Sequence, residues 1–125
     1  MMETFLQRFN KAVLLIHGSF RTAKLAHDED VRNAYDDISD ALGLSYTAVA
    51  LLVWALNNMD SKLVEMSSVA SQIGYPEDSV SPSIDELERH HYMVKVEDLN
   101  DSLAVTATTK ELLINHYCFY KLMKN

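Results

Sequence analysis

Apolar residues near the start of the chain recur every three or four positions, which is the spacing of one face of an α-helix. The stripe consists of Phe5, Leu6, Phe9, Val13, Ile16 and Phe20. After a polar break at 27–30, the same spacing runs from Val31 to Leu42 and stops at Gly43, a residue typical of helix ends. The pattern therefore predicts two amphipathic helices in residues 1–44.

The middle of the chain contains its longest apolar run, Ala48 to Leu56. Because nearly every position is apolar, a helix there would be buried on nearly all sides, with Ser45 as its N-cap. The run is far shorter than the roughly 20 residues that cross a bilayer. It predicts the core helix of a soluble domain.

Two shorter helices are predicted next. A short strand at 62–64 and a helix at 67–73 lead to Gly74, which ends that helix. The following segment places three apolar residues on one helical face, namely Val80, Ile84 and Leu87. Two short helices joined by a tight turn are typical of a helix-turn-helix.

The last third of the chain predicts a hairpin and a final helix. The apolar runs 92–96 and 103–107 flank the polar stretch EDLNDS, and Thr108 is a possible cap for a helix that continues to Met123. The expected fold class is mostly α with a small β-hairpin, a winged helix-turn-helix in a single domain. Residues 1–44 form a helical dimerisation region, 45–107 the winged helix-turn-helix, and 108–125 a C-terminal dimerisation helix.

Three stretches resemble the MarR-type transcriptional regulators. They are LGLSYTAVALLVWAL, SSVASQIGYPEDSVSPSIDELERHHYMVKV and ATTKELL, and the likeness covers residues 42–113. The short C-terminal end is nearer to the SarA-like branch of that superfamily. The resemblance implies a recognition helix at 78–91, a reduced wing at 97–102 and a dimer built from the terminal helices.

The chain departs from the family at the positions that usually contact DNA. Pro82 stands where the family has Arg or Lys, and Asp101, Ser102 and Leu103 stand where its wing carries an Asp-x-Arg pair. Because proline has no N–H, Ser81 is the expected cap of a helix that begins late.

The charge of the predicted recognition helix is a further departure from the family. The net charge is −7, and no basic residue occurs between Pro76 and Glu88. Carboxylates near phosphates release no counterions, so DNA affinity should suffer. The segment instead offers an acidic interaction face, formed by Glu77, Asp78, Asp85, Glu86 and Glu88. A merely solvated helix face would give the same run of charge.

Two functions follow from these features. The first is a cytoplasmic bacterial regulator, a homodimer that binds operator DNA weakly or atypically through Ser79, Ser81, Ser83, Arg89, His90 and Lys95. The second is an interaction module or DNA mimic that has lost DNA binding. It would act on a basic partner or on another regulator, for example as a heterodimer with a DNA-binding relative.

The two ends of the chain carry more apolar surface than a small domain can cover, which predicts a two-fold homodimer. The expected interface residues are Phe5, Phe9, Val13, Ile16, Phe20, Tyr117, Phe119 and Tyr120.

Other chemistry finds little support in the sequence. The single cysteine, Cys118, forms no internal disulfide, and no leader segment opens the chain, which favours a reducing cytoplasm. His90 and His91 would point about 100° apart on a helix, which suits no shared metal ion. No catalytic constellation, cofactor site or metal site is expected.

Overall fold

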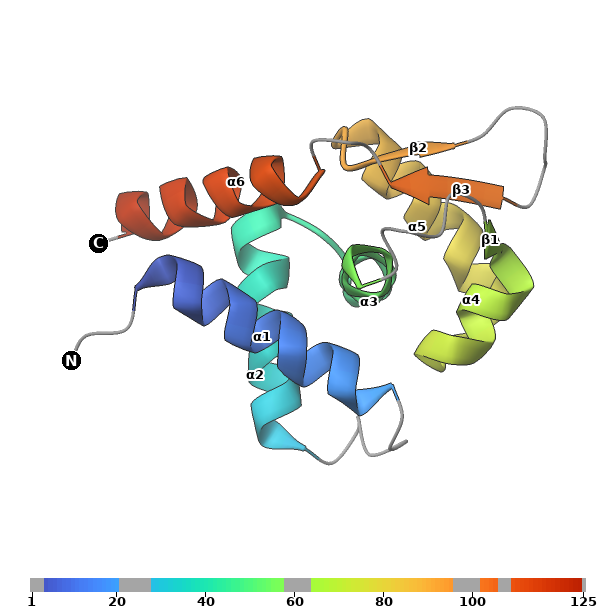
Figure 1. The fold of residues 1–125 in the computed structure, drawn as a ribbon, viewed down its shortest axis with the longest axis horizontal. Coiled ribbons are helices and arrows are strands. Elements are labelled where there is room, and N and C mark those ends of the chain that lie inside the picture. The colour runs from blue at the N-terminus through green and yellow to red at the C-terminus, as the bar shows by residue number, and fades with distance from the viewer. Residues whose placement is uncertain (1–3, 21–27, 58–63, 96–101, 106–108, 125) are drawn as a thin grey trace.

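The computed structural model of the protein describes residues 4–20, 28–57, 64–95, 102–105 and 109–124. Figure 1 shows α3 end-on near the centre, with α1 and α2 on one side of it and α4 and α5 on the other. Helix α6 lies beside α1 and α2. In chain order the elements are α1 (Phe5–Ser19), α2 (Glu29–Leu42), α3 (Tyr46–Leu56), β1 (Val64–Glu65), α4 (Met66–Ile73), α5 (Glu77–Arg89), β2 (Met93–Lys95), β3 (Ser102–Val105) and α6 (Thr109–Lys124).

The first three helices begin where polar side chains can bind free backbone N–H groups. Thr4 and Gln7 form a reciprocal capping box at α1, Asp28 caps α2, and Ser45 caps α3. Helix α2 ends at Gly43, whose φ of 69° is the left-handed conformation that glycine adopts without strain. The start of α3 and the end of α2 therefore lie where the sequence predicts them.

The hydrophobic core is built around α3. Every residue of this helix from Ala48 to Ala55 is buried. Helix α5 covers one side of it with Val80, Ile84 and Leu87, all of which are buried as their shared helical face predicts. This packing fixes which face of α5 is left for solvent.

The expected fold class is corrected by the structure. Side chains are described for residues 4–20, 28–57, 69–92 and 111–123; 85% of this part is helical and it contains no strand. The three strands are short, with two to four residues each. They form one three-stranded sheet in the order β1-β3-β2, whereas the sequence predicted a separate two-stranded hairpin. The described part is thus a six-helix protein with a marginal sheet, and the predicted winged architecture is wrong.

The physical reason lies partly at Tyr92, which was expected to open the first strand of the hairpin. Its backbone N–H instead donates to the Leu87 carbonyl at 2.9 Å, so Tyr92 completes the end of α5, and its side chain is buried. Backbone pairing begins only at Met93, which lies opposite Val105. Residues 96–101, most of the expected wing, lie outside the described residues.

Helix α5 begins earlier than the sequence predicts. Its first residue is Glu77, so Pro82 lies inside the helix and Ser81 is not its cap. Pro82 has no N–H to donate to the carbonyl of Asp78, four residues before it. The buried apolar face of α5 compensates for that missing hydrogen bond, because unwinding the first turn would expose Val80.

Replacing Pro82 by alanine should therefore stabilise the protein. Pro82 is exposed, so Pro82→Ala restores a helical N–H without disturbing the core, and we expect the free energy of unfolding to rise by about 1–2 kcal/mol. Urea denaturation followed by circular dichroism measures the change. Pro76→Ala, just before the helix, is the matched control and should give no gain. A loss of stability in Pro82→Ala would show that the helix depends on proline at this position.

Candidate interaction surface

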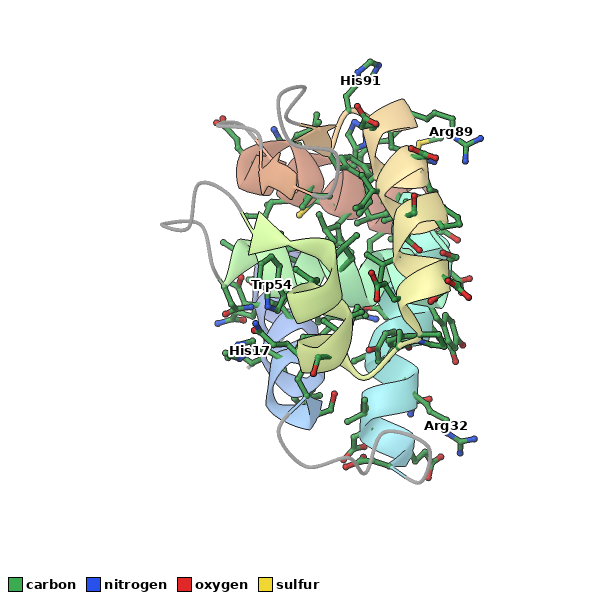
Figure 2. All side chains as sticks on the ribbon, turned by 90° about the vertical axis from the view of Figure 1, so that its right-hand side faces the viewer. His17, Arg32, Trp54, Arg89 and His91 are labelled. Atoms are coloured by element: carbon green, nitrogen blue, oxygen red, sulfur yellow. The ribbon has the colours of Figure 1, made fainter. Side chains whose placement is uncertain are left out.

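One face of α5 is turned to solvent along its whole length. Figure 2 shows this helix at an edge of the molecule, with Arg89 projecting outward. Its buried residues pack inward against α3, and Glu88 is half-buried. The exposed positions are Glu77, Asp78, Ser81, Pro82, Asp85 and Arg89.

Two of the serines predicted to contact DNA are engaged within the helix. Ser83 is buried and its Oγ donates to the Ser79 carbonyl at 2.8 Å, while the Oγ of Ser79 donates to the Pro76 carbonyl at 2.7 Å. Ser81, Arg89 and His90 are exposed. Lys95 lies in β2, but its side chain falls outside the described part. The structure therefore leaves few donors facing outward on α5.

Glu86 has a structural role that the sequence did not reveal. Its two carboxylate oxygens accept hydrogen bonds from the backbone N–H and the Oγ of Ser45, each at 2.8 Å. Ser45 Oγ in turn accepts the N–H of Ala48 and caps α3. Glu86 thus ties α5 to the start of the core helix, and this contact draws it away from the acidic interaction face.

Four carboxylates remain on that face, and we call them the acidic face: Glu77, Asp78, Asp85 and Glu88. Glu77 and Asp78 lie in the first turn of a helix whose N-cap, Pro76, makes no side-chain hydrogen bond, so they also stabilise the helix dipole. Asp85 and Glu88 have no such role at the other end of α5. Together with Pro82 and Arg89 they line a shallow hollow of about 570 Å³.

The C-terminal end of α5 is attached to α6 by aromatic contacts. The Tyr92 hydroxyl lies 3.0 Å from Nδ1 of His116, and the His90 ring stacks on the Tyr92 ring with centroids 5.6 Å apart. Burial raises the pKa of Tyr92. His91 adopts a φ of 62° and is exposed. In the part of the chain with described side chains, no three His, Cys, Asp or Glu residues converge on a metal position.

Several residues that were expected at a dimer interface are buried in the hydrophobic core of the single chain. Phe9, Ile16 and Tyr117 are buried, and the rings of Phe9 and Tyr117 are 5.1 Å apart, because α6 folds back on α1. This position leaves them almost no surface for a second chain. Of the other expected residues, Phe119 is 66% exposed. Those that are half-buried are Phe5, Val13, Phe20 and Tyr120.

Other apolar side chains are exposed on the same two helices. They are Leu6 and Leu14 on α1 and Leu122 and Met123 on α6, together with Phe119. Periodicity assigned Leu6 to the buried stripe of the first helix and Met123 to the apolar positions of the last helix, but it gave no signal for Leu14 and Leu122. Which residues of α1 and α6 stay exposed depends on how the two helices pack against each other, and periodicity does not predict that packing.

The attachment of α6 depends on Asp37, a residue of α2. Its carboxylate accepts hydrogen bonds from the Tyr117 hydroxyl and the Lys121 ammonium, and Arg8 Nη2 lies 3.5 Å from Oδ1. Burial, followed by the hydrogen bond to Asp37, raises the pKa of Tyr117. The Lys121 ammonium also lies over the rings of Tyr117 and Tyr120, at 5.3 and 5.9 Å from their centroids. Asp37 therefore links α1, α2 and α6.

No known protein family, curated protein or solved structure matches the chain. The resemblance to MarR-type regulators thus stays a prediction from the quoted motifs. Among the described residues no single helix is long and apolar enough to cross a membrane, although α2 and α3, bent by 95° relative to each other, reach that length and composition as a pair.

Proposed function

We propose that this protein is an interaction module that presents the acidic face of α5 to a basic segment of another protein. The observation that supports this proposal most directly is the composition of the outward surface of α5. That surface carries four carboxylates and a single cation, Arg89. A surface of one sign attracts a partner of the opposite sign, accelerates its approach and selects against partners of like charge.

The same surface is poorly suited to DNA. A duplex seated on α5 would place carboxylates next to phosphates, and the serines that could have donated to phosphate are engaged at Ser79 and Ser83. The Ser45–Glu86 contact holds the helix in this orientation. We therefore place the interaction-module interpretation ahead of the regulator interpretation.

Binding measured over a series of salt concentrations tests the proposal. A short oligoarginine peptide should bind the full chain at low salt, and its affinity should fall as salt is added, because the contact is electrostatic. A random DNA duplex that carries the same fluorescent label as the peptide should not bind at low salt. Failure of the peptide to bind under these conditions would contradict the proposal.

A regulator that binds operator DNA is the second candidate. Helices α4 and α5 are consecutive and joined by a tight turn at Gly74, whose φ is 77°, and Ser81 and Arg89 face outward. In the same salt series this candidate predicts duplex binding with a definite negative slope of log affinity against log salt. The two functions are thus separated by one experiment.

We further propose that the protein is a cytoplasmic homodimer joined through the exposed apolar residues of α1 and α6. Isolated apolar residues are ordinary on a surface, but Phe119, Leu122 and Met123 lie within one and a half turns of a single helix. Phe119→Ser combined with Leu122→Ser should convert a dimer into a monomer in analytical ultracentrifugation. Asn115→Ala, an exposed change on the same helix, should leave the dimer intact. A monomeric wild-type chain would contradict this proposal.

A further inference from the structure

A groove lies between α1 and α2, on a different surface from the acidic face of α5. The two helices pack against each other and cross in Figure 1. The groove has a volume of about 480 Å³, which suits a small molecule. Its floor is apolar and consists of Ala12, Leu15 and Ala34. Both alanines are buried, and their short side chains leave space between the longer residues on either side.

The two walls of the groove carry opposite charges. Arg8 and Lys11, one turn apart on α1, form the cationic wall, and α1 contains no acidic residue. The only basic residue of α2, Arg32, projects away from α1 in Figure 2. The wall that α2 provides is therefore acidic, and it consists of Asp30, Asn33, Asp36, Asp37 and Asp40.

Few of these opposite charges pair with each other directly. Arg8 lies 3.5 Å from Asp37, and its side chain is 42% exposed, so it keeps N–H donors for another acceptor. In the part of the chain whose side chains are described, Lys11 and Asp30 form no ion pair. Opposite charges that line one groove without contacting each other leave room for a molecule that contacts both walls.

The contact between Arg8 and Asp37 marks one end of the groove. Asp37 already accepts hydrogen bonds from side chains of α6, so its carboxylate has little capacity left for a ligand. One turn away from this contact, on each helix, are Lys11 and Asn33, and Asp30 is one turn further along α2. This part of the groove thus offers an unpaired cation, an amide and an unpaired carboxylate around an apolar floor.

We propose that this groove binds a free amino acid with an apolar side chain. The carboxylate of the ligand accepts hydrogen bonds from Lys11 and Arg8. Its ammonium group donates to the carboxylate of Asp30 and to Oδ1 of Asn33, and its side chain lies on the apolar floor. A zwitterion satisfies both walls, whereas a simple anion meets the repulsion of α2 and a simple cation that of α1. The site is separate from the acidic face and does not depend on the proposed function.

Titration of the isotope-labelled full chain with L-leucine, followed by the backbone amide signals in NMR spectra, tests the proposal. Saturable shifts should appear in α1 and α2 around the groove. Isocaproate is leucine without its ammonium group, and isoamylamine is leucine without its carboxylate. Each should bind roughly fivefold more weakly than leucine, because it contacts only one wall. Equal binding of all three compounds, or an absence of saturable shifts with leucine, would overturn the site.

Two pairs of variants locate the contacts. Lys11→Gln and Asp30→Asn should each weaken leucine binding roughly fivefold, and Asp30→Asn should not weaken isocaproate binding, since isocaproate has no ammonium group to donate. The matched controls Arg32→Gln and Glu29→Gln remove the same charges at exposed positions outside the groove and should bind leucine like the wild type. Glu29 and Asp30 share the first turn of α2, so their replacement affects the helix dipole alike. Equal losses in the variants and their controls would contradict the site.

Discussion

Reversing the charge of Asp85 and Glu88 should weaken binding of the oligoarginine peptide by about 30-fold at low salt, because two attractions become two repulsions. The double variant Asp85→Lys, Glu88→Lys should retain its helix content. Both substitutions lie near the C-terminal end of α5, where positive side chains favour the helix dipole. Titration calorimetry at low salt measures the loss, and added salt should reduce the difference between variant and wild type.

The matched control reverses two exposed carboxylates of α2, in the variant Asp36→Lys, Asp40→Lys. It changes the net charge by the same amount and also places lysines in the second half of a helix. If the net negative charge of the whole protein attracts the peptide, both variants should lose affinity equally. If the face of α5 is the binding surface, the α5 variant should lose far more. Equal losses would contradict the assignment of the surface.

Sequence reasoning succeeded where a structural signal is local. The apolar spacing of Val80, Ile84 and Leu87 predicted which face of α5 is buried, and the cap at Ser45 and the stop at Gly43 lie where the residue types placed them. These features depend on a few neighbouring residues. Periodicity and capping therefore suffice to predict them.

Sequence reasoning failed where a contact joins distant parts of the chain. Glu86 binds Ser45, 41 residues earlier, and nothing in the local sequence distinguishes Glu86 from the acids around it. Tyr117 has the apolar surface expected of an interface residue, yet α6 returns to bury it against Phe9. The start of α5 was misplaced for a related reason, since the local effect of Pro82 was weighed without the burial of Val80.

The acidic face shows how structure narrows a prediction made from charge. From the sequence alone, the five carboxylates of this segment were compatible with three interpretations: a solvated helix face, a DNA mimic or a binding surface for a basic partner. The structure assigns Glu86 to holding α5 against α3 and gives Glu77 and Asp78 a second role at the helix dipole. Asp85 and Glu88 are the carboxylates of α5 that have no such structural use in the described part of the chain. They are therefore the residues whose replacement tests function with the least effect on folding.

Replacing Asp37 by alanine should give the largest loss of stability, about 2–3 kcal/mol in the free energy of unfolding. Asp37 and Lys121 are 18% and 15% exposed, so the pair is largely, though not wholly, removed from water. The substitution leaves the Lys121 ammonium and the Tyr117 hydroxyl without their acceptor in a place where water reaches them poorly. The Arg8 contact adds little, since it is long and exposed.

Urea denaturation monitored by circular dichroism measures this loss, and Asp36→Ala, an exposed neighbour on the same helix, should stay within about 0.5 kcal/mol of the wild type. A double-mutant cycle of Asp37→Ala with Tyr117→Phe should show a coupling of about 1–2 kcal/mol, because the two substitutions remove the same hydrogen bond. Additive effects would mean that Asp37 does not hold α6 through Tyr117. Since α6 covers Phe9 and carries Phe119 and Leu122, loosening it at Asp37 should also weaken the proposed dimer.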